Sequence, residues 1–108
     1  MPRQISAIEL AKHIANGRPV LLIDVRQPWE NAIAALPESL LIPLGELARR
    51  AHEVKPQAGA TIVAYCHHGM RSLSAAAILE KAGFADVLSL AGGIDAWALG
   101  VDPSVARY

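Results

Sequence analysis

The segment from Cys66 to Ser72 holds the residues best suited to covalent chemistry. It reads Cys66-His67-His68-Gly69-Met70-Arg71-Ser72. The thiolate of a cysteine is a strong nucleophile, and an arginine carries a permanent charge with a forked geometry that suits an oxyanion. A glycine permits a backbone with positive φ, which lets several N–H groups of one loop converge on an anion. The segment therefore indicates a nucleophilic cysteine in an anion-binding loop.

A buried structural thiol is the alternative interpretation of Cys66, because free cysteine is among the most buried residue types. Cys66 is the one cysteine of the chain, so it cannot form an internal disulfide, and a secreted disulfide scaffold is excluded. Two histidines, a glycine and an arginine follow it within five residues. A cysteine that only packs needs no such neighbours, so the context favours the nucleophile.

His67 and His68 also allow more than one interpretation. Cysteine and histidine are zinc ligands, but adjacent histidines point in different directions and no fourth ligand is clustered with them. We therefore expect no metal here. We expect the histidines to line the mouth of the pocket with partial positive charge near neutral pH, unless one simply packs against the surface.

The elements that must position this loop are visible as apolar runs separated by helical patterns. The runs cover residues 20–23, 40–42, 61–65 and 87–90, and they lack clean alternation, as expected of parallel strands buried on both faces. A short edge strand is expected around Gln4 and Ile5. Helices are expected over residues 6–15, 28–35, 44–52, 72–82 and 94–99, the first with a capping box of Ser6 and Glu9.

This alternation predicts an α/β fold with a mostly parallel sheet and helices on both faces. Active sites of open α/β sheets lie beyond the carboxyl ends of the strands. Cys66 directly follows the third run and precedes a helix, so the helix dipole adds positive potential at the thiol.

Asp24 and Arg26 follow the first run, at the same edge as Cys66. They could form a pocket wall, or they could be a charged pair that fastens the loop. A carboxylate beside an anionic substrate costs free energy unless it is paired, which favours the second interpretation. Glu30 is likewise expected to be structural. Gly92-Gly93 lacks the spacing and the lysine of a P-loop, and we expect it to let two backbones approach closely.

Length and composition limit the remaining possibilities. The chain has 108 residues, of which 53% are hydrophobic, and this predicts one domain over residues 1–108. Ten basic and ten acidic residues cancel, which argues against a nucleic-acid partner and against a polybasic membrane surface. No apolar run long enough for a signal peptide or a membrane span is present, so we expect a cytoplasmic protein.

Several motifs, taken in order, resemble the rhodanese (sulfurtransferase) family. The loop Cys66-x-x-Gly69-x-Arg71-Ser72 is similar to the family's active-site loop. The other similar stretches are Leu22-Ile23-Asp24-Val25-Arg26 with Pro28-Trp29-Glu30, Ile42-Pro43-Leu44, Gly83-Phe84, and Val87-x-x-Leu90-x-Gly92-Gly93-x-x-Ala96-Trp97. The chain departs from the family at residues 34–38, where Ala-Ala-Leu-Pro-Glu replaces a Gly-His pair and an Ile-Pro-Gly turn. We expect this to alter a loop and its local hydrogen bonds.

The resemblance implies a single rhodanese domain with a parallel sheet of about five strands. It implies that Cys66 takes a sulfane sulfur from a small anionic donor such as thiosulfate and becomes a persulfide. The sulfur then passes to cyanide, a thiol or a protein, and no cofactor or metal is required. The residues expected to bind the substrate are His67, His68, Gly69, Met70, Arg71 and Ser72.

Two other functions stay open. Related folds use a Cys-to-Arg loop for phosphatase or arsenate reductase chemistry, but four residues separate Cys66 from Arg71, one fewer than in phosphatase loops. The shorter loop fits a sulfur atom better than a phosphoryl group. A non-catalytic or persulfide-carrier regulatory module is the other possibility, although inert rhodanese-like domains often lose the cysteine that this chain retains.

Overall fold

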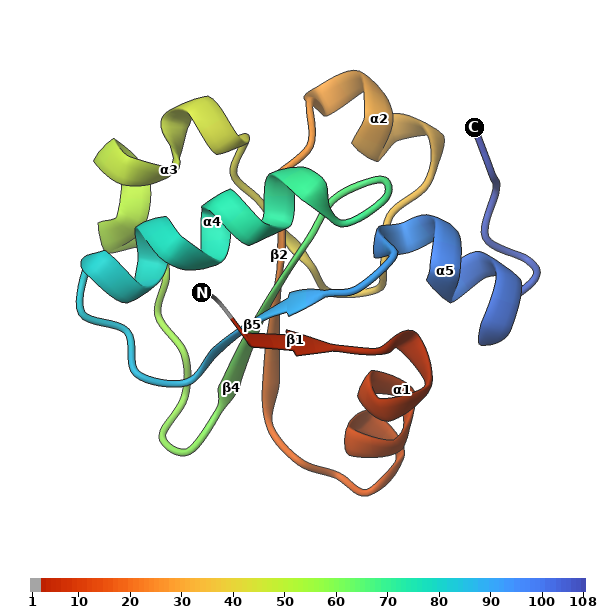
Figure 1. Ribbon diagram of the computed structural model, residues 1–108, viewed down its shortest axis with the longest axis horizontal. Helices are drawn as coiled ribbons and strands as arrows, with labels where there is room; N and C mark the ends of the chain where they lie inside the picture. Colours follow the sequence, from red (N-terminus) through yellow and green to blue (C-terminus); the bar gives the residue numbers. More distant parts are fainter. Residues whose placement is uncertain (1–2) are drawn as a thin grey trace.

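The computed structural model describes residues 3–108 and is built on a five-stranded sheet (Figure 1). Its strands lie in the order β1 (Arg3–Ile5), β5 (Val87–Leu90), β4 (Thr61–Tyr65), β2 (Val20–Asp24) and β3 (Leu40–Leu41). Every pairing is parallel. The predicted α/β class and the short edge strand near Gln4 are confirmed.

Helices cover both faces of the sheet (Figure 1). On one face α1 (Ala7–Ala15) lies beside α5 (Gly93–Gly100), and on the other α3 (Leu44–Arg50) lies beside α4 (Met70–Lys81). The short helix α2 (Pro28–Ile33) follows the carboxyl end of β2, and a 3₁₀ turn, η1 (Ala51–Glu53), extends α3. None of the helices in residues 3–108 combines the length and apolar character needed to cross a membrane.

Strand β4 shows why the apolar runs lack simple alternation. Ile62 and Ala64 pack into the core beneath α3 and α4, whereas Val63 and Tyr65 pack into the core beneath α1 and α5. Successive side chains of a strand point to opposite faces, so a strand covered on both sides is apolar at most positions on either face.

The helices begin and end close to the predicted residues, and capping residues explain their first turns. The capping box of α1 is present: Ser6 Oγ accepts a hydrogen bond from Glu9 N–H at 3.1 Å, and Glu9 Oε1 accepts one from Ser6 N–H at 3.2 Å. Helix α2 ends at Ile33, not at residue 35. Helix α4 begins at Met70, two residues before the predicted start, because Gly69 forms its N-cap with φ +101°.

The segment that departs from the rhodanese pattern forms a turn beside Tyr65. The Tyr65 hydroxyl accepts a hydrogen bond from Leu36 N–H at 3.1 Å and shares one with Ser39 Oγ at 2.8 Å. Glu38 lies within this turn with φ +60°, at the position that matches the glycine of the motif described above. An L-residue in this left-handed region carries a steric penalty.

Replacing Glu38 by glycine is expected to raise the free energy of unfolding by about 0.5–1 kcal/mol. Relief of the left-handed strain contributes about 1–2 kcal/mol, and the larger unfolded-state entropy of glycine removes part of it. Urea unfolding measures the change. Glu38→Ala is the control, because it removes the same side chain and keeps the strain. Equal stabilisation by both variants would show that the side chain, not the backbone, is responsible.

Candidate active site

Cys66 begins the segment that leads from the end of β4 into the first turn of α4, which we call the cradle loop (residues 66–72). Its side chain lies in the core and only 1% of the residue is exposed. Its sulfur is nevertheless in a polar setting: Sγ accepts hydrogen bonds from Gly69 N–H at 3.1 Å and from Ser72 N–H at 3.4 Å. The cysteine is thus packed like a core residue while its sulfur faces backbone donors, and its role as a nucleophile stays a prediction.

The left-handed turn at Gly69 gives the cradle loop its shape. With φ +101° at Gly69, the chain curls so that the N–H groups of Gly69 and Ser72 face the same sulfur. The first turn of α4 follows at once and adds the partial positive charge of a helix N-terminus. Ser72 Oγ lies 3.5 Å from Sγ and shares a 2.7 Å hydrogen bond with Ser89 Oγ of β5.

The turn at Gly92 and Gly93 supports the cradle loop from behind. Ile94 N–H donates to the Cys66 carbonyl at 2.9 Å, and Asp95 N–H donates to the His67 carbonyl at 3.2 Å. A Cβ on Gly93 would overlap both carbonyl oxygens. The expected close approach of two backbones is therefore present, and it turns the loop carbonyls toward α5 and away from the sulfur.

Arg71 forms a two-pronged ion pair with Glu30 of α2. Its Nη1 and Nη2 donate to Glu30 Oε1 at 2.6 Å and to Oε2 at 2.9 Å. Glu30 Oε1 also accepts a hydrogen bond from Gln27 N–H at 3.1 Å. The guanidinium fork is thus occupied by a carboxylate of the same chain, so the pair ties α2 to the cradle loop.

Asp24 and Arg26 form a second ion pair, which is fully buried. Arg26 Nε and Nη2 donate to the two Asp24 carboxylate oxygens at 2.8 and 2.7 Å, and Nη2 also donates to the Ala34 carbonyl. Asn31 Nδ2 donates to Asp24 Oδ2 at 2.9 Å. Neither charged side chain has any exposed surface, so the pair fastens the end of β2 and offers no wall to an open pocket.

The histidines lie at the surface end of the cradle loop. The His67 ring is stacked between the rings of His68 and Tyr108, with centroids 3.9 Å away on each side. Burial, together with the nearby His68, lowers the pKa of His67 below its ordinary value. This direction disfavours the partial positive charge expected of His67, which stays a prediction. Met70 is 76% exposed beside the histidines.

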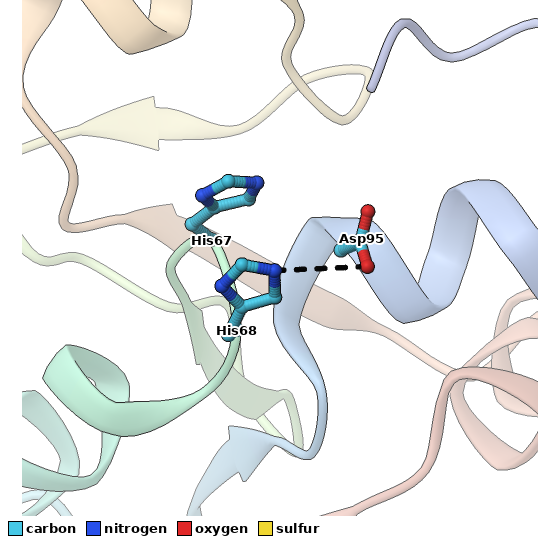
Figure 2. A group of neighbouring side chains, drawn as sticks. All are labelled: His67, His68 and Asp95. Carbon is cyan, nitrogen blue, oxygen red and sulfur yellow. Dashed lines mark ion pairs between the residues drawn. The ribbon is translucent and has the colours of Figure 1, made fainter. Parts of the chain in front are cut away.

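Figure 2 shows the group of His67, His68 and Asp95, whose ligand-type atoms all lie within 4.8 Å of one another. A metal ion binds an imidazole nitrogen in the plane of the ring, but these two rings are stacked at an interplanar angle of 25°. Asp95 is already paired with Arg107 at 2.8 Å and approaches His68 at 3.7 Å. The arrangement as it stands fits an ion-pair cluster better than a coordination site.

The similarity of the chain to known proteins agrees with this geometry. The family model of the rhodanese-like domain matches residues 6–99. The chain belongs to the rhodanese family. A protein named sulfurtransferase from Allochromatium vinosum is 37% identical over 106 residues, covering 98% of this chain and 97% of that protein.

Solved rhodanese structures share the whole fold. A rhodanese-related protein from Thermoplasma volcanium superposes with a TM-score of 0.82 at 27% identity, covering 98% of this chain and 99% of the other. The human single-domain sulfurtransferase TSTD1 superposes with a TM-score of 0.78 at 26% identity, covering 93% and 98%.

Some curated relatives are much longer. The probable adenylyltransferase/sulfurtransferase MoeZ of Mycobacterium tuberculosis is 38% identical over 104 residues, which cover 96% of this chain and 26% of that protein. The rhodanese domain thus spans about a quarter of MoeZ, and its relatives are sulfurtransferases both as single domains and as parts of larger proteins.

The tertiary structure adds three residues to the site of this rhodanese domain. Glu30 is the partner of Arg71, Ser89 holds Ser72, and Tyr108 covers His67. Ser89 had a sequence signal, since it is a polar residue inside an apolar run. Glu30 belongs to a motif that the sequence shows, but the sequence does not show which residue it pairs with. Nothing in the sequence indicated a role for Tyr108.

The Glu30–Arg71 ion pair predicts how stability depends on pH. The Arg71 hydrogen bonds, assisted by Tyr108 and Gln27, lower the pKa of Glu30 from 4.5 to about 2. When the pKa of a carboxyl is lower in the folded protein than in the unfolded chain, its charge stabilises the fold. This stabilisation is complete at pH values above the pKa in the unfolded chain, and it is lost as the pH falls through the pKa in the folded protein. We therefore expect the stability difference between wild type and Glu30→Gln to shrink as the pH falls from about 5 to about 2.

Urea unfolding of both proteins across this pH range measures the difference. Glu46→Gln is the matched control, because Glu46 forms a partly exposed ion pair with Arg50, and ion pairs that solvent reaches contribute little. A Glu30→Gln difference that stays constant with pH would show that the carboxylate charge does not stabilise the fold.

Proposed function

We propose that this rhodanese domain transfers a sulfane sulfur from thiosulfate, or a similar small anionic donor, through a persulfide on Cys66. The observation that carries the proposal is the convergence of the Gly69 and Ser72 N–H groups on Sγ. Preorganised donors of this kind stabilise negative charge on the sulfur at no further cost of reorganisation. They suit a thiolate, and they suit the anionic outer sulfur of a persulfide.

The proposed reaction has two displacement steps. In the first, the Cys66 thiolate attacks the sulfane sulfur of thiosulfate, the S–S bond of the donor breaks, and sulfite leaves with its electron pair. In the second, a nucleophile such as cyanide or a thiolate attacks the outer sulfur, and the Cys66 thiolate leaves with the electron pair of the persulfide bond. Atoms and electrons balance in both steps without a cofactor.

The residues around Cys66 have separate roles in this proposal. The cradle-loop N–H groups and the start of α4 hold negative charge on the sulfur, while the Arg71–Glu30 pair fixes the far end of the loop. His68 and Met70, exposed beside the loop, are the side chains that an incoming donor or acceptor meets first. The proposed acceptor of the sulfur is a thiol or a protein. The proposed location is the cytoplasm, as expected from the sequence.

Intact mass spectrometry tests the proposal directly. Incubation with thiosulfate is expected to add about 32 Da, the mass of one sulfur atom, to the protein. Cyanide is then expected to remove that mass and to yield thiocyanate. A protein that gains no mass from thiosulfate would contradict the proposed donor.

The same experiment, together with an assay of phosphate-ester hydrolysis, separates the two alternatives. A carrier or regulatory module would not catalyse the transfer, so thiocyanate would form from thiosulfate and cyanide no faster than it does without the protein. A phosphatase would hydrolyse a phosphate ester and gain no sulfur. The four-residue spacing from Cys66 to Arg71 and the occupied fork of Arg71 favour the sulfurtransferase over the phosphatase.

A further inference from the structure

The Tyr108 hydroxyl connects the two ion pairs of the site. It accepts a hydrogen bond from Arg26 Nη1 at 2.9 Å and donates one to Glu30 Oε2 at 2.7 Å. Arg26 is paired with Asp24, and Glu30 is paired with Arg71. One continuous network therefore runs from the buried end of β2, through Tyr108, to the cradle loop.

The ring of Tyr108 makes a second, independent contact with the cradle loop. It stacks on His67 with a centroid distance of 3.9 Å and an interplanar angle of 8°, and it meets Trp29 edge-on at 6.1 Å. His67 is the neighbour of Cys66 along the chain. The ring thus lies between α2 and the cradle loop, and it restrains the residue next to the proposed nucleophile.

The segment after α5 holds Tyr108 in this place. It runs back from α5 toward α2 (Figure 1), and Arg107 in it pairs with Asp95 of α5 at 2.8 Å. Val101, Val105 and Tyr108 pack against the core beneath α1 and α5. The segment lies outside the family match, which covers residues 6–99.

We propose that Tyr108 is a positioning residue for sulfur transfer at Cys66, acting through Glu30 and Arg71 on one side and through His67 on the other. The inference rests on the proposed function of Cys66. Tyr108 itself does not contact the sulfur: it holds the groups that give the cradle loop its shape.

The chemistry of the hydroxyl explains why its loss matters. Glu30 is buried, and its Oε2 accepts from Arg71 Nη2 and from Tyr108. Burial raises the pKa of Tyr108 above its ordinary value, so the hydroxyl is protonated and able to donate at neutral pH. Without it, one carboxylate oxygen and one arginine N–H lose a charge-assisted hydrogen bond, and the Glu30–Arg71 pair is free to shift.

The test compares Tyr108→Phe with wild type in the rate of sulfur loading from thiosulfate, followed by rapid quenching and intact mass. We expect the second-order rate constant to fall about tenfold, which is the usual size of a lost hydrogen bond to a charged group. Tyr108→Ala also removes the stack on His67, and we expect a fall of about a hundredfold. Loading at the wild-type rate in Tyr108→Phe would overturn the proposal.

Tyr65→Phe is the matched control. It removes one buried tyrosine hydroxyl, but that hydroxyl contacts Leu36 and Ser39 and not Glu30. We expect it to change thermal stability while the loading rate of the folded protein stays at the wild-type value. An equal loss of rate in Tyr65→Phe and Tyr108→Phe would overturn the proposal, since it would show a general effect of loosened packing.

A double-mutant cycle tests the route through Glu30. In a Glu30→Gln background, Tyr108→Phe is expected to cause little further loss of loading rate, because residues that act through one another are not additive. A further tenfold loss in that background would overturn the route. Failure of the proposed function looks different, since wild type itself would then take up no sulfur.

Discussion

Cys66→Ser is expected to take up no sulfur from thiosulfate and to form no thiocyanate above the uncatalysed background. Removing the nucleophile from a covalent mechanism reduces turnover by at least about 10⁴-fold. A serine hydroxyl does not ionise near neutral pH, and it cannot form a persulfide with the outer sulfur of the donor. Steady-state thiocyanate formation and intact mass together measure the loss.

The substitution is small enough that the fold should survive it. Serine is close to cysteine in volume, and its oxygen can still accept the N–H groups of Gly69 and Ser72. We therefore expect the far-ultraviolet circular dichroism spectrum to stay that of wild type. A folded Cys66→Ser protein that still produced thiocyanate at the wild-type rate would rule out the Cys66 persulfide.

Gly93→Ala is expected to lower the free energy of unfolding by about 3–5 kcal/mol, because it combines backbone strain with a steric overlap that cannot relax easily. The added Cβ would overlap the carbonyl oxygens of Cys66 and His67. Backbone atoms cannot rotate away as a side chain can. The cradle loop would have to move, so we also expect sulfur loading to be lost in any protein that remains folded.

Gly17→Ala is the matched control for this prediction. Gly17 has φ +73°, close to the +62° of Gly93, but a Cβ there would meet no atom within 4 Å. The free energy of unfolding of Gly17→Ala should fall only by the cost of the left-handed conformation, about 1–2 kcal/mol. Urea unfolding of both variants separates the two effects. Equal losses would show that strain alone, without the contact to the cradle loop, accounts for the Gly93→Ala effect.

The elements of the fold were largely predictable because their signals are local. Apolar runs give the strands, and the capping box of Ser6 and Glu9 gives the start of α1. The predicted start of α4 was two residues late, and the reason also lies in the local sequence. Helix α4 starts at Met70 because the left-handed Gly69 can form its N-cap, and the sequence shows that a glycine permits such a turn without showing that it adopts one.

The site was predictable only as a set of candidate residues. The charge of His67 could not be judged from the sequence, because burial and the nearby His68, which lower its pKa, arise only in the folded chain. Arg71 was expected to hold the substrate anion, but its fork is filled by Glu30, 41 positions earlier in the chain. Partners at such separations leave no pattern in a single sequence.

The sequence by itself determined the order of the elements, the place of Cys66 between a strand and a helix, and membership of the rhodanese family. The first two depend on hydrophobic periodicity and on the order of residues within short segments, which physical chemistry constrains locally. The family was indicated by the resemblance of its motifs. Only the tertiary structure decided which charges neutralise one another, that Gly93 abuts the Cys66 backbone, and that Tyr108 reaches Glu30 across 78 positions. Such contacts form when the sheet brings distant segments to one edge, and their free energies depend on burial and distance, which appear only once the chain is folded.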